Sequence, residues 1–228
     1  MKGHRPQSRS YGNRAAPVQR IAAVLVTIAC LFAPALARAE PVKIVALGDS
    51  LTAGYGLPVA DAFPTKLQAA LKAKGVDASV ANAGVSGDTA SGGLERVDWS
   101  VPDGTDAVIV ELGANDALRG LDPKLTEKAL DAILTKLDQR HIPVLLAGMK
   151  APPNMGADYA KAFDAIYPRL AAKHAVIVYS FFLDGVVADA KLNQGDGMHP
   201  TAAGVDIIVA RILPSVEQLI AKARETQK

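Results

Sequence analysis

The sequence has 228 residues, of which 50% are hydrophobic and 21% are charged. This balance excludes a disordered or fibrous chain and fits one compact globular domain, and a chain of this length can bury a core without disulfides or metals. The formal net charge of +2 is too small to indicate a nucleic-acid partner.

The first 39 residues differ from the rest of the chain. Six of the Lys and Arg residues and none of the Asp and Glu residues fall here, an apolar run spans 21–36, and Ala37-Arg38-Ala39 follows it. This order is typical of a secretory signal peptide, so we expect cleavage after Ala39 and an exported protein, periplasmic or secreted. The run of about 16 residues is short for a membrane span of about 20. An uncleaved anchor and a lipoprotein signal ending at Cys30 are the alternatives.

Removal of this leader changes the chemistry that the chain can perform. The remaining residues 40–228 carry 19 basic and 23 acidic side chains, a net charge of −4, and Cys30, the only cysteine, is lost. A thiol-free chain suits an oxidising compartment and excludes cysteine catalysis, thiolate metal sites and disulfides. We therefore expect neither nucleic-acid binding nor stable membrane insertion after cleavage.

From Pro41 onward, short apolar runs alternate with amphipathic stretches. In chain order the sequence predicts a strand at Val42–Leu47, a helix at Phe63–Lys74, strands at Ala78–Ala81 and Ala107–Leu112, a helix at Pro123–Arg140, a strand at Val144–Gly148, a helix at Asp158–Lys173, a strand at Val176–Tyr179 and a closing helix from Pro200 to about Lys222. Asp122 is expected to cap the second helix, and Pro214 to kink or break the last one. Apolar strands separated by helices indicate an α/β fold, a single three-layer α/β/α domain with a five-stranded parallel sheet over residues 40–228.

A serine follows the first predicted strand, in the run Gly48-Asp49-Ser50. Sites in open parallel sheets lie beyond the carboxyl ends of the strands, so Ser50 stands where a nucleophile would meet its substrate. On position alone, a loop whose Ser50 or Asp49 caps a helix is an equally good interpretation.

Possible hydrogen-bond donors follow the next two strands. Gly84 comes after the second strand, and Gly113-Ala114-Asn115 after the third. Glycine exposes a backbone N–H and asparagine adds a side-chain N–H, and such donors stabilise an oxyanion. Taken singly, each segment is ordinary turn chemistry.

A histidine stands near the C-terminus, in Asp196-Gly197-Met198-His199. The spacing lets the carboxylate reach one imidazole nitrogen while the other faces a serine. The alternative is that Asp196 caps the last helix and His199 is solvated. His141 and His174 precede strands, at the wrong edge of the sheet, and are expected to be structural.

The combination is more specific than its parts, because a nucleophile, a base, an orienting carboxylate and oxyanion donors complete the set for acyl transfer. No Gly-x-Ser-x-Gly occurs, which disfavours the nucleophile elbow of α/β hydrolases. The chain resembles the SGNH (GDSL) hydrolase family, and closely its bacterial acyl-CoA thioesterase I / protease I / lysophospholipase (arylesterase) group. The likeness lies in GDSLTAGYG from Gly48, NAGVSGDTASGGLERV from Asn82, VELGANDALRG from Val110, AIYPRLA from Ala165 and DGMHP from Asp196.

The resemblance implies a flavodoxin-like SGNH fold and assigns roles to residues. Ser50 would be the nucleophile, with Asp196 and His199 as its partners, and the oxyanion hole would comprise the Ser50 and Gly84 backbones and the Asn115 side chain. Ala114 is a departure, because close relatives often have glycine there. By position and by resemblance, Met149 and Pro153 are expected to border the acyl group, although a plain connecting loop is an equally good interpretation.

These features predict a serine esterase that hydrolyses carboxylic acyl esters and thioesters, small or lipid-derived, without a metal or organic cofactor, and acts as a monomer. A carbohydrate acetylesterase of the same family is an alternative, disfavoured by the 5% content of aromatic residues. A metallohydrolase using Asp49, Asp196 and His199 lacks a multi-histidine cluster. A non-catalytic exported binding protein would leave the coincidence of serine, asparagine and histidine unexplained.

Overall fold

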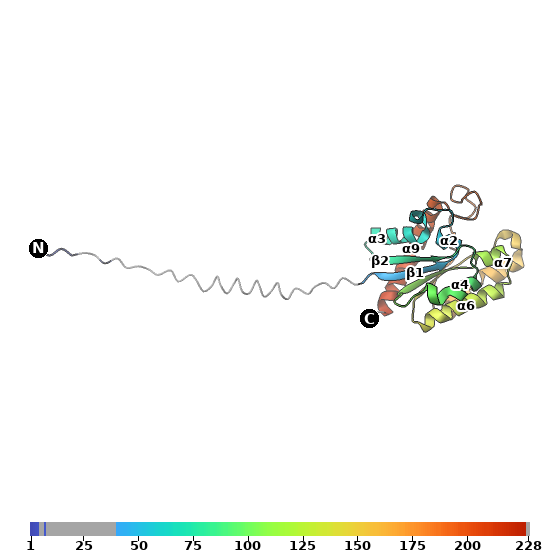
Figure 1. Cartoon of the computed structure of the whole chain (residues 1–228), viewed down its shortest axis with the longest axis horizontal. Coiled ribbons are helices and arrows are strands. Elements are labelled where there is room, and N and C mark those ends of the chain that lie inside the picture. Colours follow the sequence, from blue (N-terminus) through green and yellow to red (C-terminus); the bar gives the residue numbers. More distant parts are fainter. Residues whose placement is uncertain (5–6, 8–39, 227–228) are drawn as a thin grey trace. The chain divides into compact units, whose positions relative to one another are not determined.

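The computed structural model describes residues 1–4, 7 and 40–226, and the chain divides into two units, Met1–Ala39 and Glu40–Lys228. The helices and strands of the described residues lie in the second unit (Figure 1). The expected signal peptide and its alternatives concern a segment that lies almost entirely outside the described residues. They therefore stay predictions.

Five strands and the helices between them alternate along the second unit. The strands are β1 (Val42–Gly48), β2 (Ala78–Gly84), β3 (Ala107–Glu111), β4 (Val144–Ala147) and β5 (Ile177–Tyr179). The helices are α2 (Ser50–Ala53), α3 (Phe63–Ala73), α4 (Ala90–Ser100), α5 (Ala114–Leu118), α6 (Pro123–Gln139), α7 (Ala157–Asp164), α8 (Ile166–His174) and α9 (Ala202–Thr226), with 3-10 turns η1 (Val59–Asp61) and η2 (Pro153–Met155).

The strands form one parallel sheet in the order β2-β1-β3-β4-β5. Helices α3 and α9 pack together on one face, and α4, α6 and α8 cover the other (Figure 1). This is the three-layer, flavodoxin-like arrangement that the sequence predicts, and the prediction is confirmed. The strand order reverses beside β1, where Gly48 pairs with Gly84 on one side and Glu111 on the other. The carboxyl ends of β1, β2 and β3 therefore meet at the position where such sheets hold their sites.

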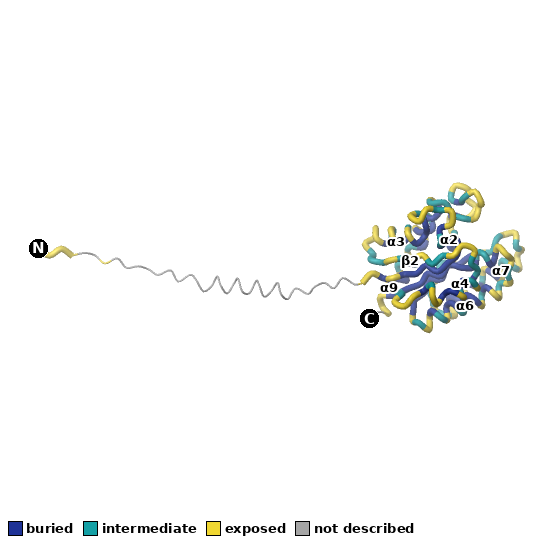
Figure 2. Tube along the Cα trace, in the orientation of Figure 1, coloured by how far each residue is buried: buried dark blue, intermediate teal, exposed yellow. Residues whose placement is uncertain are grey.

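The core runs along the central strands (Figure 2). Every residue of β3 and β4 is buried, as expected for parallel strands covered by helices on both faces. Strand β2 lies at an edge and is only partly buried, which explains its weak apolar pattern in the sequence. It extends to Gly84, three residues past the predicted end, so Gly84 belongs to the strand and not to the following turn.

Two predicted helices differ from the structure. The helix expected at Asp158–Lys173 is divided into α7 and α8 at Ala165. Pro168 lies in the first turn of α8 and has no N–H to donate to the carbonyl of Asp164, so a continuous helix would lose that bond. In contrast, α9 continues across Pro214 without a break, because buried side chains before and after Pro214 hold both halves against the core.

Helix α4 is absent from the sequence prediction, which treated the segment after β2 as glycine-rich. Thr89 caps its N-terminus by accepting from the Gly92 N–H. Gly93 faces the core, where a Cβ would collide with Leu112, so the glycine that weakens the helical pattern lets α4 pack close to the sheet. The spacing of the buried Ala90, Gly93 and Val97 is the sequence signal that could have revealed this helix.

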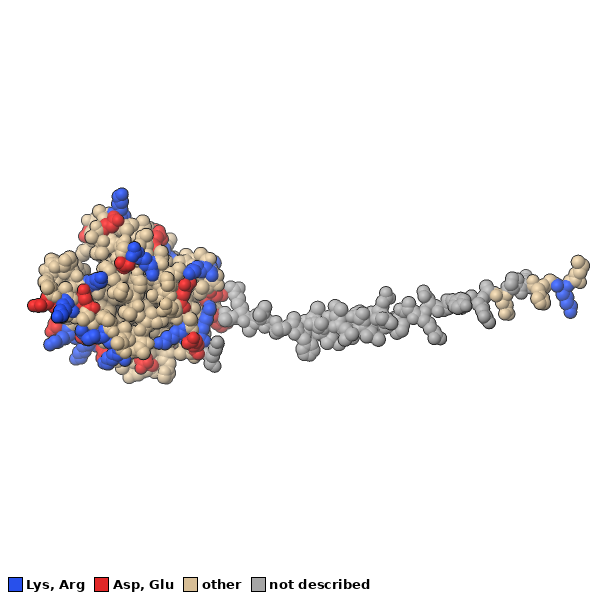
Figure 3. Space-filling view, turned by 180° about the vertical axis from the view of Figure 1, so that it is seen from behind, with Lys and Arg blue, Asp and Glu red and all other residues tan. Residues whose placement is uncertain are grey.

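The surface of the second unit carries charges of both signs. Figure 3 shows acidic and basic side chains interspersed on the face that it presents. Within the described residues, no helix is both long enough and apolar enough to cross a membrane.

Candidate active site

Ser50 lies at the carboxyl end of β1, as the first residue of the one-turn helix α2. Asp49 caps this helix, and its Oδ1 accepts from the Leu51 N–H at 3.0 Å. Gly54, at a φ of 80°, ends it. Glycine is required at position 48, because a Cβ there would meet the side chains of Thr52 and Glu111. The helix-cap interpretation thus holds for Asp49 and leaves the Ser50 hydroxyl for another partner.

That partner is His199, and the two residues are joined to Asp196 in one chain of hydrogen bonds. His199 Nε2 lies 2.9 Å from Ser50 Oγ, and His199 Nδ1 lies 2.6 Å from Asp196 Oδ2. Hydrogen bonds from the His199 backbone and ring and from the Met198 N–H lower the pKa of Asp196 to about 2. An ionised carboxylate only accepts, so Nδ1 carries the proton and Nε2 is free to accept from the Ser50 hydroxyl. Asp196 therefore does not cap the last helix, which begins at Ala202.

The loop that carries His199 is tied to the loop that carries Ser50. Its ends are joined by a bridge between Asn193 and Pro200, and the Gln194 N–H donates to the His199 carbonyl at 2.7 Å. The Gln194 side chain reaches across to donate to the Tyr55 carbonyl at 2.8 Å. The Tyr55 ring stacks at a tilt on His199, with centroids 4.6 Å apart. These contacts set the imidazole over the serine.

Gly84 is the last residue of β2, and Asn115 is the second residue of α5, the helix that follows β3. Strands β2 and β3 flank β1, which leads to Ser50. The Gly84 N–H donates to Asn82 Oδ1 at 2.9 Å. Asn115 Nδ2 donates to Asp49 Oδ2 at 3.1 Å and to the Asp88 carbonyl at 2.9 Å. Both groups are donors at this edge, and in this state both are engaged by acceptors of the protein itself.

Backbone freedom near Asn115 is needed at Gly113 and not at Ala114. Gly113 has a φ of 117°, and a Cβ there would collide with the Tyr167 hydroxyl. Ala114 is the first residue of α5, in helical backbone that suits alanine. The departure from glycine at position 114 is therefore accommodated.

Two buried acids, Asp49 and Glu111, lie at the carboxyl ends of β1 and β3. The sequence analysis did not identify them as a pair. Burial raises the pKa of Asp49 to about 6, against opposing hydrogen bonds from Leu51 and Asn115. Burial, and then the charge of Asp49, raise the pKa of Glu111 well above its ordinary value. The Thr52 hydroxyl donates to Glu111 Oε2 at 2.7 Å. Glu111, the carboxylate in the apolar run of β3, is the sequence signal that could have revealed this pair.

The two residues expected to border the acyl group occupy different environments. Met149 is only 3% exposed and packs in the core. Pro153 is exposed, at the start of η2. Their role in substrate binding stays a prediction.

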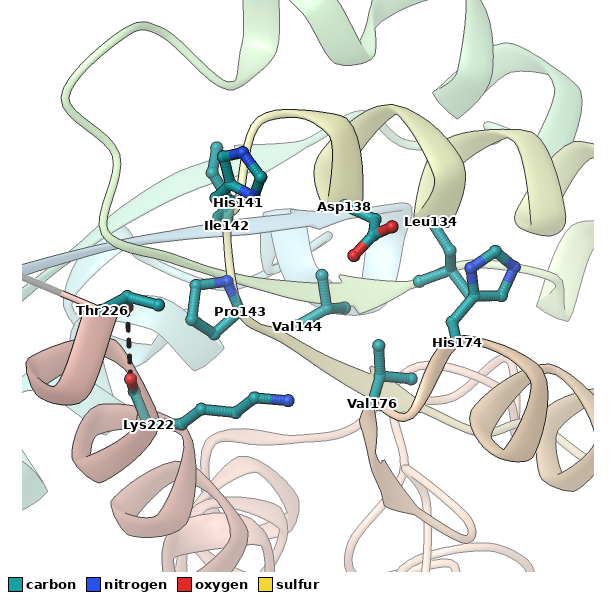
Figure 4. Close-up of a pocket in the computed structure, with 10 residues that line it drawn as sticks. All are labelled: Leu134, Asp138, His141, Ile142, Pro143, Val144, His174, Val176, Lys222 and Thr226. Atoms are coloured by element: carbon teal, nitrogen blue, oxygen red, sulfur yellow. Dashed lines mark hydrogen bonds between the residues drawn. The ribbon is translucent and has the colours of Figure 1, made fainter.

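His141 and His174 lie at the opposite edge of the sheet from Ser50, where they line a cavity of about 190 Å³ with residues of α6, α9 and the strand ends (Figure 4). His174 Nε2 lies 2.7 Å from Asp131 Oδ1, which joins α8 to α6. The geometry agrees with a structural role for His174. Within residues 1–4, 7 and 40–226, no group of three or more His, Cys, Asp or Glu side chains is arranged to hold a metal ion.

Three comparisons with known proteins identify the family. Residues 46–207 match the model of the GDSL-like lipase/acylhydrolase family. An arylesterase of Vibrio mimicus is 36% identical over 177 residues, 77% of this chain and 88% of that protein. The thioesterase 1/protease 1/lysophospholipase L1 of Escherichia coli K12 is 36% identical over 178 residues, 78% of this chain and 84% of that one. The crystal structure of AlinE4, an SGNH-hydrolase family esterase, superposes with a TM-score of 0.68 at 46% identity and covers 79% of this chain and 97% of its own.

The match over residues 46–207 includes the segments that carry Ser50, Gly84, Asn115 and His199. The chain belongs to the GDSL-like lipase/acylhydrolase family.

Proposed function

We propose that this carboxylic ester hydrolase cleaves acyl esters and thioesters through an acyl-enzyme on Ser50. The observation that supports the assignment is the continuous hydrogen-bond chain from Ser50 Oγ through the His199 ring to Asp196. A serine is a weak nucleophile until a neighbouring base accepts its proton, and a base works best when a third group orients it. Here all three groups are within hydrogen-bond distance before substrate binds.

The reaction proceeds in two halves. His199 Nε2 takes the Ser50 proton as Oγ attacks the acyl carbonyl, and the resulting imidazolium is stabilised by Asp196. The same nitrogen then gives the proton to the departing alcohol or thiol, which leaves the acyl group on Ser50. Water, deprotonated by His199, releases the acid and restores the serine.

The oxyanion formed in each half is held by the Ser50 and Gly84 N–H groups and by Asn115 Nδ2. Their placement at or just beyond the carboxyl ends of neighbouring strands supports this assignment, since these ends meet at one edge of a parallel sheet. A full negative charge competes for Gly84 and Asn115 more strongly than a neutral carbonyl does. The donors therefore favour the transition state over the bound substrate.

The relatives are an arylesterase and a thioesterase/lysophospholipase, so the substrate is an aryl or lipid-derived acyl compound, bound without a cofactor. Met149 and Pro153 border the acyl group in this proposal. The enzyme acts as a monomer and is exported. The basic and apolar character of the leader supports export.

The test is to treat the protein with a fluorophosphonate ester and map the modified peptide by mass spectrometry. Attack by Ser50 Oγ on phosphorus expels fluoride and leaves one phosphonyl group on that serine. We expect a single adduct on Ser50, lost in Ser50→Ala and strongly slowed in His199→Ala. A folded protein that forms no adduct, or a Ser50→Ala variant with normal esterase turnover, would refute the assignment.

The range of substrates is measured on the same preparation. Turnover of p-nitrophenyl esters of increasing chain length is compared with that of acyl thioesters and acetylated sugars. We expect aryl esters and thioesters to be cleaved faster than acetylated sugars. The reverse order would instead favour a carbohydrate acetylesterase.

A further inference from the structure

A buried arginine lies behind the proposed oxyanion site. Arg96 projects from α4 and is only 6% exposed. Its Nε donates to Asp88 Oδ2 at 2.6 Å, its Nη1 to the Ala83 carbonyl at 2.7 Å and to Ser100 Oγ at 3.1 Å, and its Nη2 to the Gly48 carbonyl at 2.7 Å. A guanidinium is retained in such a place only when its donors are paired, and a planar fork can hold several acceptors in a fixed arrangement.

Each of three partners lies next to a group in the proposed site. Gly48 ends β1 two residues before Ser50. Ala83 immediately precedes Gly84. The third partner, Asp88, uses its backbone carbonyl to accept from Asn115 Nδ2. One side chain therefore contacts the segments that carry Ser50 and Gly84 directly, and it reaches Asn115 through Asp88.

The contact with Ala83 is the most direct of the three. The Ala83 carbonyl and the Gly84 N–H belong to one planar peptide group, and they point in opposite directions. A hydrogen bond that fixes the carbonyl toward Arg96 also fixes the N–H away from it. The positive charge polarises the same peptide, which makes its N–H a stronger donor.

The contact with Asp88 acts on Asn115. The ion pair between Arg96 Nε and Asp88 Oδ2 holds residue 88, and Asp88 then holds the Asn115 amide from its backbone carbonyl. A displaced Asp88 would leave Asn115 with Asp49 as its remaining partner. A shift of about 1 Å at a catalytic donor is enough to slow an enzyme by about a hundredfold.

We propose that Arg96 is the positioning residue of the oxyanion site, which sets the Gly84 N–H directly and Asn115 through Asp88. This inference rests on the proposed function, because it assumes that these donors face the acyl oxygen. Arg96 touches no reacting atom. Its effect is therefore on the rate of acyl transfer and not on the affinity for the substrate.

The experiment is a double-mutant cycle of Arg96→Lys with Asn115→Ala, measured as kcat and KM on a p-nitrophenyl ester below the unfolding transition. Lysine keeps the charge and loses the fork. We expect Arg96→Lys alone to lower kcat by about 10- to 100-fold and Asn115→Ala by about 100- to 1000-fold, each with KM changed less than about threefold. The double variant should fall short of the product of these losses, because the part of the Arg96 effect that passes through Asp88 to Asn115 is already lost in Asn115→Ala, while the part that acts on Gly84 remains.

Leu137→Ala is the matched control. Leu137 is buried in α6, so its truncation lowers stability by leaving a cavity, and it belongs to none of the segments that form the proposed site. This variant should keep the parent kcat. Losses that multiply in the cycle, an unchanged kcat in Arg96→Lys, or an equal drop in Leu137→Ala would overturn the proposal.

If Arg96→Lys does not fold, Asp88→Asn replaces it in the double-mutant cycle with Asn115→Ala. It weakens the ion pair while keeping the backbone carbonyl that holds Asn115, so we expect a smaller loss of kcat that is again less than multiplicative with Asn115→Ala. Fluorophosphonate labelling separates the two hypotheses. A labelled Ser50 with a multiplicative cycle rejects only the role of Arg96, whereas an unlabelled Ser50 in the parent protein rejects the proposed function itself.

Discussion

At the scale of single residues, the proposed site holds its donors against acceptors of its own. Asn115 Nδ2 is shared between Asp49 and Asp88, and the Gly84 N–H is bound to Asn82. Forming an oxyanion must displace or share these bonds, so a neutral substrate carbonyl gains little from them. This is an advantage for catalysis, because interactions that strengthen only in the transition state accelerate the chemical step.

Asp49 yields a prediction about stability and pH. Burial raises its pKa to about 6, above the value of about 3.9 in an unfolded chain. The unfolded state therefore releases the proton first, and the contribution of Asp49 to stability is full below about pH 4 and is lost as pH rises through 6. In Asp49→Asn, which cannot ionise, that loss disappears.

The measurement is the free energy of unfolding of both proteins in urea between pH 4 and 7.5. We expect the parent protein to lose stability relative to Asp49→Asn as the pH rises. Glu111 shifts in the same direction and adds to the trend in both proteins. A difference between the two proteins that stays constant with pH would show that Asp49 ionises as readily in the fold as in water.

At the scale of elements, Pro168 in α8 and Pro214 in α9 differ in what they cost the hydrogen bonding of their helices. Pro168 sits in the first turn of α8, where its missing N–H has no helical acceptor in any case. Pro214 sits in the middle of α9, where its missing N–H leaves the Ala210 carbonyl without a helical bond. Ala210 and Pro214 are both exposed, so water can reach that carbonyl.

We therefore predict that Pro214→Ala raises the free energy of unfolding. The gain should be about 1–2 kcal/mol, since the restored hydrogen bond is partly offset by a more flexible unfolded chain. Pro168→Ala is the control and should leave stability unchanged or slightly lower. Urea denaturation of the two variants checks this, and a loss of stability in Pro214→Ala would mean that the proline fits a bend that α9 requires.

At the scale of the whole molecule, the chain divides into the units Met1–Ala39 and Glu40–Lys228, and cleavage after Ala39 stays a prediction. We predict that the exported protein begins at Glu40 and keeps full esterase activity, because the proposed site and the core lie in the second unit. The measurement is the intact mass of protein recovered from the exporting cell. A mass that includes residues 1–39 would identify an anchor, and a lipid-modified Cys30 would identify a lipoprotein.

Much of the fold could be predicted from the sequence, because the signals are local. Buried parallel strands read as apolar runs such as Ala107–Glu111, and Asp122 and Pro123 mark the start of α6. The local rules failed at α4 and Pro214. In both cases packing against the sheet compensates for residues that disfavour a helix.

Sequence alone also determined the parts of the site that are close in the chain. Asp196 and His199 are three residues apart, so their pairing follows from local geometry. The motif around Ser50 and its place after an apolar strand indicated the nucleophile. The family likeness then assigned Gly84 and Asn115 their expected roles.

Only the tertiary structure decided how these segments meet. Ser50 and His199 are 149 residues apart, and their distance depends on the strand order and on the Gln194 contact between the two loops. The burial of Asp49, Glu111 and Arg96 could not be predicted either, because the type of a charged residue does not show whether its side chain is solvated or buried. Its environment is set by elements distant in the chain, and that environment determines its pKa and its partners.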